Sequence, residues 1–150
     1  MKLYIPLLKA HGMKINGVPR FIGKDTKFDD LSKIELGHRV IISNNVYFLT
    51  HDYSVTTAIT AGGHCPDRDI SSVRGIKIGN NVFIGMGCLI LPGTEINDNV
   101  IVGAGSVVRG NIPSNSVIAG NPAEIVSTIE KFANKWSSPE TAEFLRTDPK

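Results

Sequence analysis

Aliphatic residues recur at strict intervals of six along the middle of the chain. They are Ile78, Ile84, Ile90, Ile96, Val102 and Val108. The residue four positions after each of them is small or β-branched, and these residues are Val82, Cys88, Thr94, Val100, Ser106 and Ile112. Two registers that share one period indicate a structural repeat of six residues.

The same frame appears upstream, where Leu36, Ile42 and Phe48 are again six apart. A looser version at Ile22, Phe28 and Ile34 precedes it with an offset of two residues. The repeat therefore covers residues 22–51 and 76–121, with an interruption between them.

Six residues allow one short strand and one turn, so three such sides close a triangular coil. Successive coils stack about 4.8 Å apart through parallel backbone hydrogen bonds. The aliphatic residue of each repeat points inward and stacks on its counterpart in the next coil. The pattern predicts three such pairs: Ile78 with Ile96, Ile84 with Val102, and Ile90 with Val108.

A six-residue period leaves no room for the helices that usually connect parallel strands. The chain therefore predicts an all-β fold, a left-handed parallel β-helix of roughly four coils. The asparagine-rich segments Asn44-Asn45, Asn80-Asn81 and Asn97-Asp98-Asn99 suit corners where a positive φ is tolerated.

Outside the repeat, the chain reads as one domain (1–150) with three further segments. Residues 1–21 form an N-terminal segment, and residues 52–75 carry no repeat and are expected to form a protruding loop. In the C-terminal segment 122–150, apolar residues at helical spacing predict a helix lying on the last coil, namely Ile125, Ile129, Phe132 and Trp136. A second short helix is expected to begin at Ser138 and Pro139.

Composition narrows the classes of function. Lys and Arg number 16 against 14 Asp and Glu, without a basic run, which argues against nucleic acid as a partner. No apolar stretch is long enough for a membrane span or a signal sequence, so we expect a cytoplasmic protein. The two cysteines, Cys65 and Cys88, are too few for a disulfide framework, and no metal is expected.

Several short sequence motifs are more specific than the six-residue repeat. They are Thr50-His51-Asp52-Tyr53, Ile78-Gly79-Asn80-Asn81-Val82-Phe83-Ile84-Gly85, Ile90-Leu91-Pro92-Gly93, Val102-Gly103-Ala104-Gly105-Ser106-Val107-Val108 and Ala119-Gly120-Asn121-Pro122-Ala123. Over about residues 22–126 the chain resembles the hexapeptide-repeat acyltransferases, in particular the sugar O-acetyltransferases of surface-polysaccharide, maltose and galactoside type. The resemblance implies acetyl-CoA as co-substrate, a saccharide acceptor, and a homotrimer with active sites between subunits.

The resemblance also implies roles for individual residues. His51 would be the general base that takes the proton of the attacking hydroxyl, and Asp52 could orient its ring. The backbone N–H of Met86 would stabilise the oxyanion of the tetrahedral intermediate.

A second set of residues is assigned to acetyl-CoA by the same resemblance: Phe83, Gly85, Gly103, Ala104, Arg109, Asn121 and Pro122. Phe83 stands where relatives often have Trp. Glu124 replaces the usual basic residue, so Arg109 is the nearest positive charge for a CoA phosphate.

Alternatives remain open at this point. His64, in the predicted loop, could be the base in place of His51. The acceptor could be the nitrogen of an amino sugar, and the solenoid could be a non-catalytic scaffold. A γ-type carbonic anhydrase is disfavoured because His38, His51 and His64 are thirteen residues apart, whereas that family places two zinc ligands five residues apart.

Overall fold

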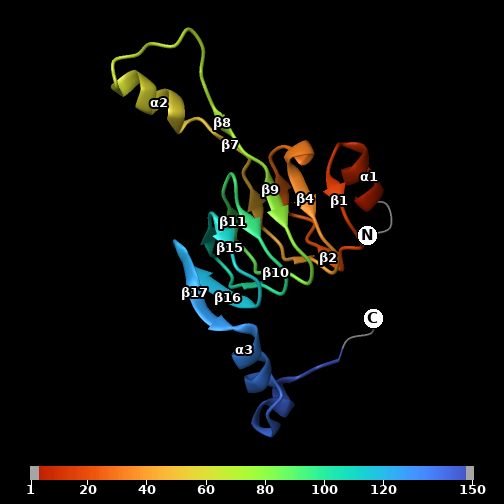
Figure 1. Ribbon diagram of the computed structural model, residues 1–150. Coiled ribbons are helices and arrows are strands. Elements are labelled where there is room, and N and C mark those ends of the chain that lie inside the picture. The colour runs from red at the N-terminus through yellow and green to blue at the C-terminus, as the bar shows by residue number, and fades with distance from the viewer. Residues whose placement is uncertain (1–3, 148–150) are drawn as a thin grey trace.

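The computed structural model describes residues 4–147. The first three residues of the predicted N-terminal segment and the last three of the C-terminal segment lie outside the described residues. Three stacks of very short strands wrap around one hydrophobic core as a parallel β-helix (Figure 1). Sheet A contains β1 (Lys14–Ile15), β4 (Ile34–Leu36), β9 (Ile76–Ile78), β12 (Glu95–Ile96) and β15 (Asn111–Ile112).

The other two walls are built in the same way. Sheet B contains β2 (Phe21–Ile22), β5 (Ile41–Ile42), β10 (Phe83–Ile84), β13 (Ile101–Val102), β16 (Ser116–Gly120) and the antiparallel β17 (Ala123–Thr128). Sheet C contains β3 (Lys27–Phe28), β6 (Tyr47–Phe48), β11 (Leu89–Ile90) and β14 (Val107–Val108).

The predicted stacking of aliphatic residues is confirmed. Ile78 pairs with Ile96, Ile84 with Val102, and Ile90 with Val108. All six side chains are at most 1% exposed. The second inward register is buried too, and its hydroxyls are satisfied locally: Thr94 donates to the Leu91 carbonyl at 2.7 Å and Ser106 to the Gly103 carbonyl at 2.6 Å. Each coil thus buries its apolar face only between its neighbours.

The asparagine corners also behave as predicted. Asn45, Asn81 and Asn99 adopt φ values of 56°, 54° and 57°. The amides of Asn81, Asn99 and Asn115 form a ladder along the edge between sheets A and B, in which Asn81 Nδ2 donates to Asn99 Oδ1 at 2.9 Å and Asn99 Nδ2 to Asn115 Oδ1 at 3.0 Å. The left-handed conformation, which other side chains tolerate poorly, and the ladder together explain the choice of asparagine.

The β-helix begins before residue 22, contrary to the expected boundary. Strand β1 pairs with β4, and helix α1 (Tyr4–Ala10) covers the open end of the core through the buried Leu8. The two-residue offset is absorbed by a 3-10 turn, η1 (Leu31–Lys33), which follows β3. As a result both Ile34 and Leu36 point into the core.

The last coil is two residues shorter than the repeat predicts. Ile112 lies opposite Ile96 in sheet A, and is therefore a strand residue instead of the corner residue of the second register. The chain shortens at the tight turn Arg109–Gly110, where Gly110 has a φ of 76°.

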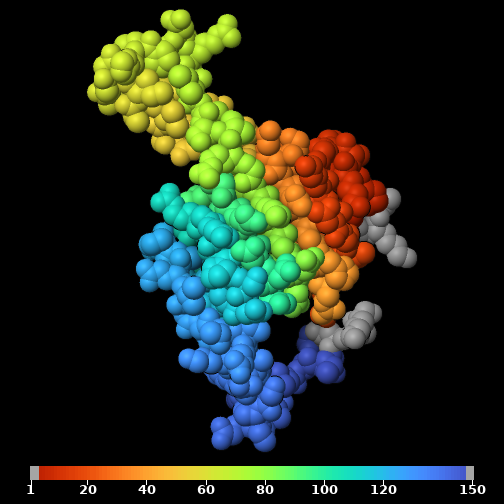
Figure 2. Space-filling view, viewed as in Figure 1, coloured from red at the N-terminus to blue at the C-terminus, as the bar shows by residue number. Residues whose placement is uncertain are grey.

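The predicted loop 52–75 is a structured arm. Strands β7 (His51–Asp52) and β8 (Ser72–Val73) pair antiparallel at its base, and helix α2 (Ser54–Ala61) lies within it. The arm projects away from the β-helix, and no residue of α2 is buried (Figures 1 and 2). The all-β description therefore holds for the β-helix and fails for the arm and for α1, whereas a C-terminal helix was expected. The sequence missed α2 because its residues, rich in Thr, carry no apolar stripe.

The C-terminal segment begins with a strand, where a helix was predicted. Strand β17 covers the edge of sheet B by pairing with β16, so Ile125 belongs to a strand and is 59% exposed. Covering this edge satisfies backbone groups that an exposed edge strand would leave unpaired. Helix α3 (Ile129–Trp136) follows, capped by Thr128, and then the 3-10 helix η2 (Pro139–Phe144). The predicted packing of this helix on the last coil is wrong, because α3 extends away from the β-helix and none of its residues is buried (Figure 1). Among residues 4–147, no helix combines the length and apolar character needed to cross a bilayer.

The stacked columns predict a large cost for one core truncation. Replacing Ile90 by Ala removes buried methyl groups from a side chain that is 0% exposed and should lower the free energy of unfolding by about 2–5 kcal/mol. Chemical denaturation at one fixed protein concentration measures this. The exposed Lys27 on the same wall provides the control, because Lys27→Ala should change stability by no more than about 0.5 kcal/mol. Equal effects of the two substitutions would contradict the packing described.

Candidate active site

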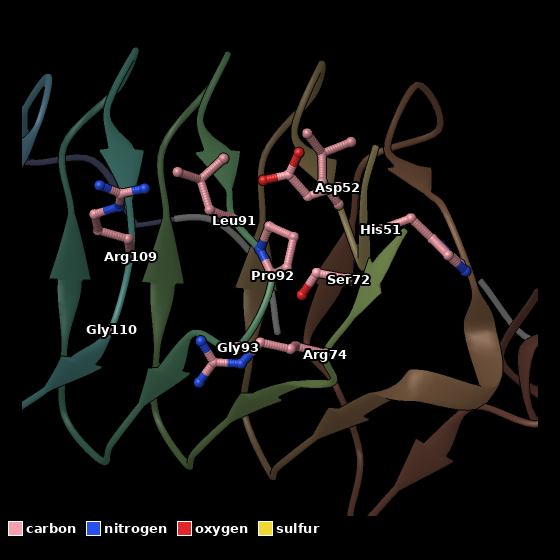
Figure 3. Close-up of a pocket in the computed structure, with 10 residues that line it drawn as sticks. His51, Asp52, Ser72, Arg74, Leu91, Pro92, Gly93, Arg109 and Gly110 are labelled. Carbon is pink, nitrogen blue, oxygen red and sulfur yellow. The ribbon is translucent and has the colours of Figure 1, made fainter. Parts of the chain in front are cut away.

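A groove of about 540 Å³ runs along the edge where the chain passes from sheet C to sheet A. Its wall is built from successive coils, because the Leu49 amide donates to the Ile90 carbonyl and the Leu91 amide to the Val108 carbonyl. Leu49, Leu91 and Arg109 are thus stacked in register, about 4.8 Å apart per coil. The groove is lined by Leu49, His51, Asp52, Ser72, Arg74, Leu91, Pro92, Gly93, Arg109 and Gly110 (Figure 3).

His51 lies at the base of the arm and is held by a carboxylate from the neighbouring coil. Its Nδ1 lies 2.7 Å from Oδ2 of Asp29. The same oxygen accepts the backbone amides of Thr50 and His51 and the hydroxyl of Thr50, each at 3.1 Å. Asp29 is brought there by the stacking of coils, since its own amide donates to the Phe48 carbonyl at 3.0 Å.

This arrangement determines which ring nitrogen can act as a base. The hydrogen bond from His51 is the largest of the interactions that lower the pKa of Asp29, and the bonds from Thr50 add to it. An ionised carboxylate can only accept hydrogen bonds, so Nδ1 must carry the proton and Nε2 keeps its lone pair. The side chain of His51 is 29% exposed, and its ring points away from Asp52, Arg74 and Arg109, on the opposite side of β7 (Figure 3).

Asp52 does not orient the ring, and the role suggested for it from the sequence is wrong. Its Oδ1 accepts the backbone amide of Ser54 at 2.9 Å, and it extends to the opposite side from His51 (Figure 3). Neighbouring residues of a strand point to opposite faces, which separates the two side chains. Hydrogen bonding by Ser54, with a smaller contribution from the charge of Arg109, lowers the pKa of Asp52. Asp52 therefore contributes a negative charge to the groove.

Asp29 was the residue that sequence reasoning missed. The signal was present in the offset repeat: Phe28 lies opposite Phe48 in sheet C, so the next residue, Asp29, must lie beside Leu49 and Thr50. Arg74 and Ser72 were missed as well, because the position of the returning strand β8 could not be deduced from a segment without a repeat.

The remaining predicted site residues gather on a different edge of the prism, where sheet B passes to sheet C. Gly85, Met86, Gly103 and Ala104 occupy successive corners there, with Phe83 on the adjacent outer face and Asn121 and Pro122 in the turn between β16 and β17. Gly85 is required for stacking, since a Cβ at that position would lie 2.6 Å from the Ala104 nitrogen. Of the predicted residues, only His51, Asp52 and Arg109 line the groove.

The other histidines and the cysteines are placed as follows. His64 lies in the turn after α2, exposed on the arm, and does not line the groove. His38 accepts the Val18 amide at Nδ1 at 3.3 Å. Cys88 is buried and donates to the Gly103 carbonyl, and burial raises the pKa of its thiol, in keeping with the predicted packing role. Cys65 is exposed.

Comparison with known proteins agrees with this architecture. Residues 75–110 match the family model described as bacterial transferase hexapeptide (six repeats). Protein CapG of Staphylococcus aureus is 37% identical over 149 residues, covering 89% of this chain and 81% of CapG. The putative lipopolysaccharide biosynthesis O-acetyl transferase WbbJ of Escherichia coli K12 is 32% identical, and the match covers 71% of this chain but only 56% of WbbJ.

A solved structure supports the same relationship in three dimensions. A galactoside acetyltransferase in complex with coenzyme A superposes with a TM-score of 0.69 and 25% identity, covering 89% of this chain and 73% of that one. The parallel β-helix deduced from the six-residue period is confirmed by these matches together with the strand pairing.

The geometry around His51 predicts its tautomer. The neutral ring should carry its proton on Nδ1, whereas the His38 ring should carry it on Nε2, because Nδ1 of His38 is an acceptor. Long-range ¹⁵N–¹H correlation spectra distinguish the two forms. Replacing Asp29 by Ala, which removes the accepting oxygen, should abolish the preference at His51 and leave His38 unchanged. An Nε2–H tautomer at His51 in the unaltered protein would overturn the proposed hydrogen-bond pattern.

Proposed function

Because the chain belongs to the hexapeptide-repeat acyltransferase family, we propose that it transfers an acetyl group from acetyl-CoA to a sugar hydroxyl, with His51 as the general base. The hydrogen bond between His51 Nδ1 and Asp29 carries this proposal, since it leaves Nε2 as a hydrogen-bond acceptor on a partly exposed ring at one end of the groove (Figure 3). The similarity to WbbJ and to a galactoside acetyltransferase supports a saccharide as the acceptor.

The chemistry follows from the state of the ring. A sugar hydroxyl is a poor nucleophile at neutral pH, so its proton must be removed as its oxygen attacks the thioester carbon. Nε2 of His51 takes that proton, and the ionised Asp29 stabilises the resulting imidazolium. When the tetrahedral intermediate collapses, the thiolate leaves and the proton on Nε2 becomes available to it. In this proposal the Met86 amide stabilises the oxyanion.

A complete site in this proposal needs two copies of the chain. The groove in one chain contains His51 and Arg109, whereas Met86, Gly103 and Ala104 lie on another edge of the prism. We therefore assign the second set to the neighbouring copy, together with Phe83, Gly85, Asn121 and Pro122, as the wall along which the pantetheine arm lies.

The outer faces of the prism support a homotrimer. Sheet A presents charged residues, among them Lys77 and Glu95, which form an ion pair at 3.1 Å. Sheets B and C instead present apolar side chains, including Phe21, Phe83 and Tyr47, which are 47%, 39% and 44% exposed in the single chain. Apolar faces of this kind usually mark interfaces, and two unlike apolar faces on each copy suit a closed ring. Within the proposal the winding is left-handed and the location cytoplasmic, where acetyl-CoA is available.

His51→Ala should abolish acetyl transfer while leaving the affinity for CoA and the mass of the trimer intact. A general base contributes about 100- to 10,000-fold to the rate. CoA release in the presence of a sugar acceptor, isothermal titration with CoA, and light scattering measure the three properties. His64→Ala is the matched control and should retain most activity. If His64→Ala lost activity and His51→Ala kept it, the assignment of the base would be wrong.

Asp29→Asn should lower kcat by about 10- to 100-fold, less than the loss of the base itself, because the amide supplies no negative charge to stabilise the imidazolium. The KM for acetyl-CoA should stay unchanged. Asp30→Asn is the control: the neighbouring carboxylate accepts the Ser32 amide and hydroxyl and caps η1. A kcat for Asp29→Asn equal to that of Asp30→Asn would exclude a role for the charge of Asp29.

A further inference from the structure

We propose that the acceptor is an anionic saccharide, recognised through a carboxylate or phosphate group by Arg74 with support from Arg109. This inference rests on the proposed function and names its substrate class. Both arginines line the same groove as His51 (Figure 3). They reach it from different parts of the chain, Arg74 just after β8 and Arg109 just after β14.

Neither guanidinium forms an ion pair or a side-chain hydrogen bond with the described residues. Among residues 4–147 the ion pairs are His51–Asp29 and Lys77–Glu95, and neither arginine makes a side-chain hydrogen bond to a described residue. An exposed arginine without a partner costs little folding free energy and is common on surfaces. Two such arginines in one groove, however, leave the five N–H donors of each guanidinium available to a ligand. Such forks suit carboxylate and phosphate groups, which they bind in a bidentate way.

The backbone is adapted to the position of Arg74. Its guanidinium packs over Gly93, where an added Cβ would lie 2.5 Å from the Arg74 Cζ. Gly93 has a φ of 79°, a conformation that favours glycine. The guanidinium of Arg74 thus packs on the Pro92–Gly93 corner, and all three residues line the groove (Figure 3).

The charges that face the groove give it a net positive character. Arg74 and Arg109 contribute two positive charges, and Asp52 contributes one negative charge. The charge of Arg109 already helps to lower the pKa of Asp52, so Arg109 is partly compensated at longer range. Asp29 lies behind the His51 ring and is paired with it. Arg74 is therefore the least compensated charge in the groove.

The position of Arg74 favours the acceptor over the phosphates of CoA as its partner. Gly93 follows Leu91, which lies one coil, about 4.8 Å, from Leu49 beside His51. The acceptor hydroxyl must reach Nε2 of His51, whose ring points away from Arg74 at one end of the groove (Figure 3), so the acceptor must extend along the groove from His51 to Arg74. The phosphates of CoA are separated from the thioester by the whole pantetheine arm. A groove of about 540 Å³ is within the usual range for a small ligand.

The test uses pairs of sugars that differ in one charged group: D-glucuronate against D-glucose, D-galacturonate against D-galactose, and glucose 6-phosphate against glucose. The full chain should bind at least one acidic member about 10- to 100-fold more tightly than its neutral partner, the ratio expected for charged hydrogen bonds. Saturation-transfer NMR without acetyl-CoA measures binding, and CoA release measures kcat/KM for each sugar.

Arg74→Gln should remove most of this discrimination, and Arg74→Lys should restore part of it because the charge is kept. Arg20→Gln is the matched control, an exposed arginine that does not line the groove. The inference is overturned if acidic and neutral sugars bind equally, or if Arg74→Gln behaves like Arg20→Gln.

A second experiment tests whether Arg74 binds the anionic group of the acceptor or a phosphate of CoA. S-acetyl-pantetheine lacks the phosphates of acetyl-CoA. If Arg74→Gln raised the KM for acetyl-CoA, left that for S-acetyl-pantetheine unchanged and did not alter sugar discrimination, Arg74 would bind CoA and the inference would fail. If the protein transferred acetyl groups only to neutral sugars, the inferred preference for anionic saccharides would be wrong and the proposed acetyltransferase function would be supported. If the protein bound no CoA or transferred acetyl groups to no sugar, the proposed function would be wrong. The NMR binding measurements would still decide whether acidic sugars are preferred.

Discussion

The structure depends on the parallel stacking of coils, which forces residues at equal positions of the repeat to lie one above another. The inward aliphatic columns can be buried only if this register is kept, as the pairs Ile84–Val102 and Ile90–Val108 show. Because the register is kept, the corners are aligned as well. Each edge of the prism becomes a row of residues that lie far apart in sequence and about 4.8 Å apart in space.

The candidate site is a direct product of that alignment. Asp29 and His51 belong to successive coils, and the backbone ladder that joins Asp29 to Phe48 also places the carboxylate against the imidazole. The four hydrogen bonds gathered on one carboxylate oxygen hold Asp29 ionised and the ring in one orientation. The stacked coils thus orient the ring of the proposed base, which lies at the point where the arm begins.

The same alignment explains why one chain holds only part of the proposed machinery. The edge between sheets C and A carries the groove with His51, Arg74 and Arg109, whereas the edge between sheets B and C carries the small residues suited to an extended ligand. Apolar outer faces on sheets B and C, beside a charged outer face on sheet A, would favour the proposed association of copies.

The sequence by itself determined the coil, its core and its corners, because a period of six constrains every inward side chain and every asparagine corner at once. It also pointed to His51 through a short motif. Only the tertiary structure decided that Asp29 replaces Asp52 as the partner of His51, and that Arg74 enters the groove. The partner depends on which coil lies beneath which, across a two-residue offset taken up by η1. The place of Arg74 depends on the return of β8 from an arm without a repeat, where pairing with β7 fixes the path of the chain and no local pattern does.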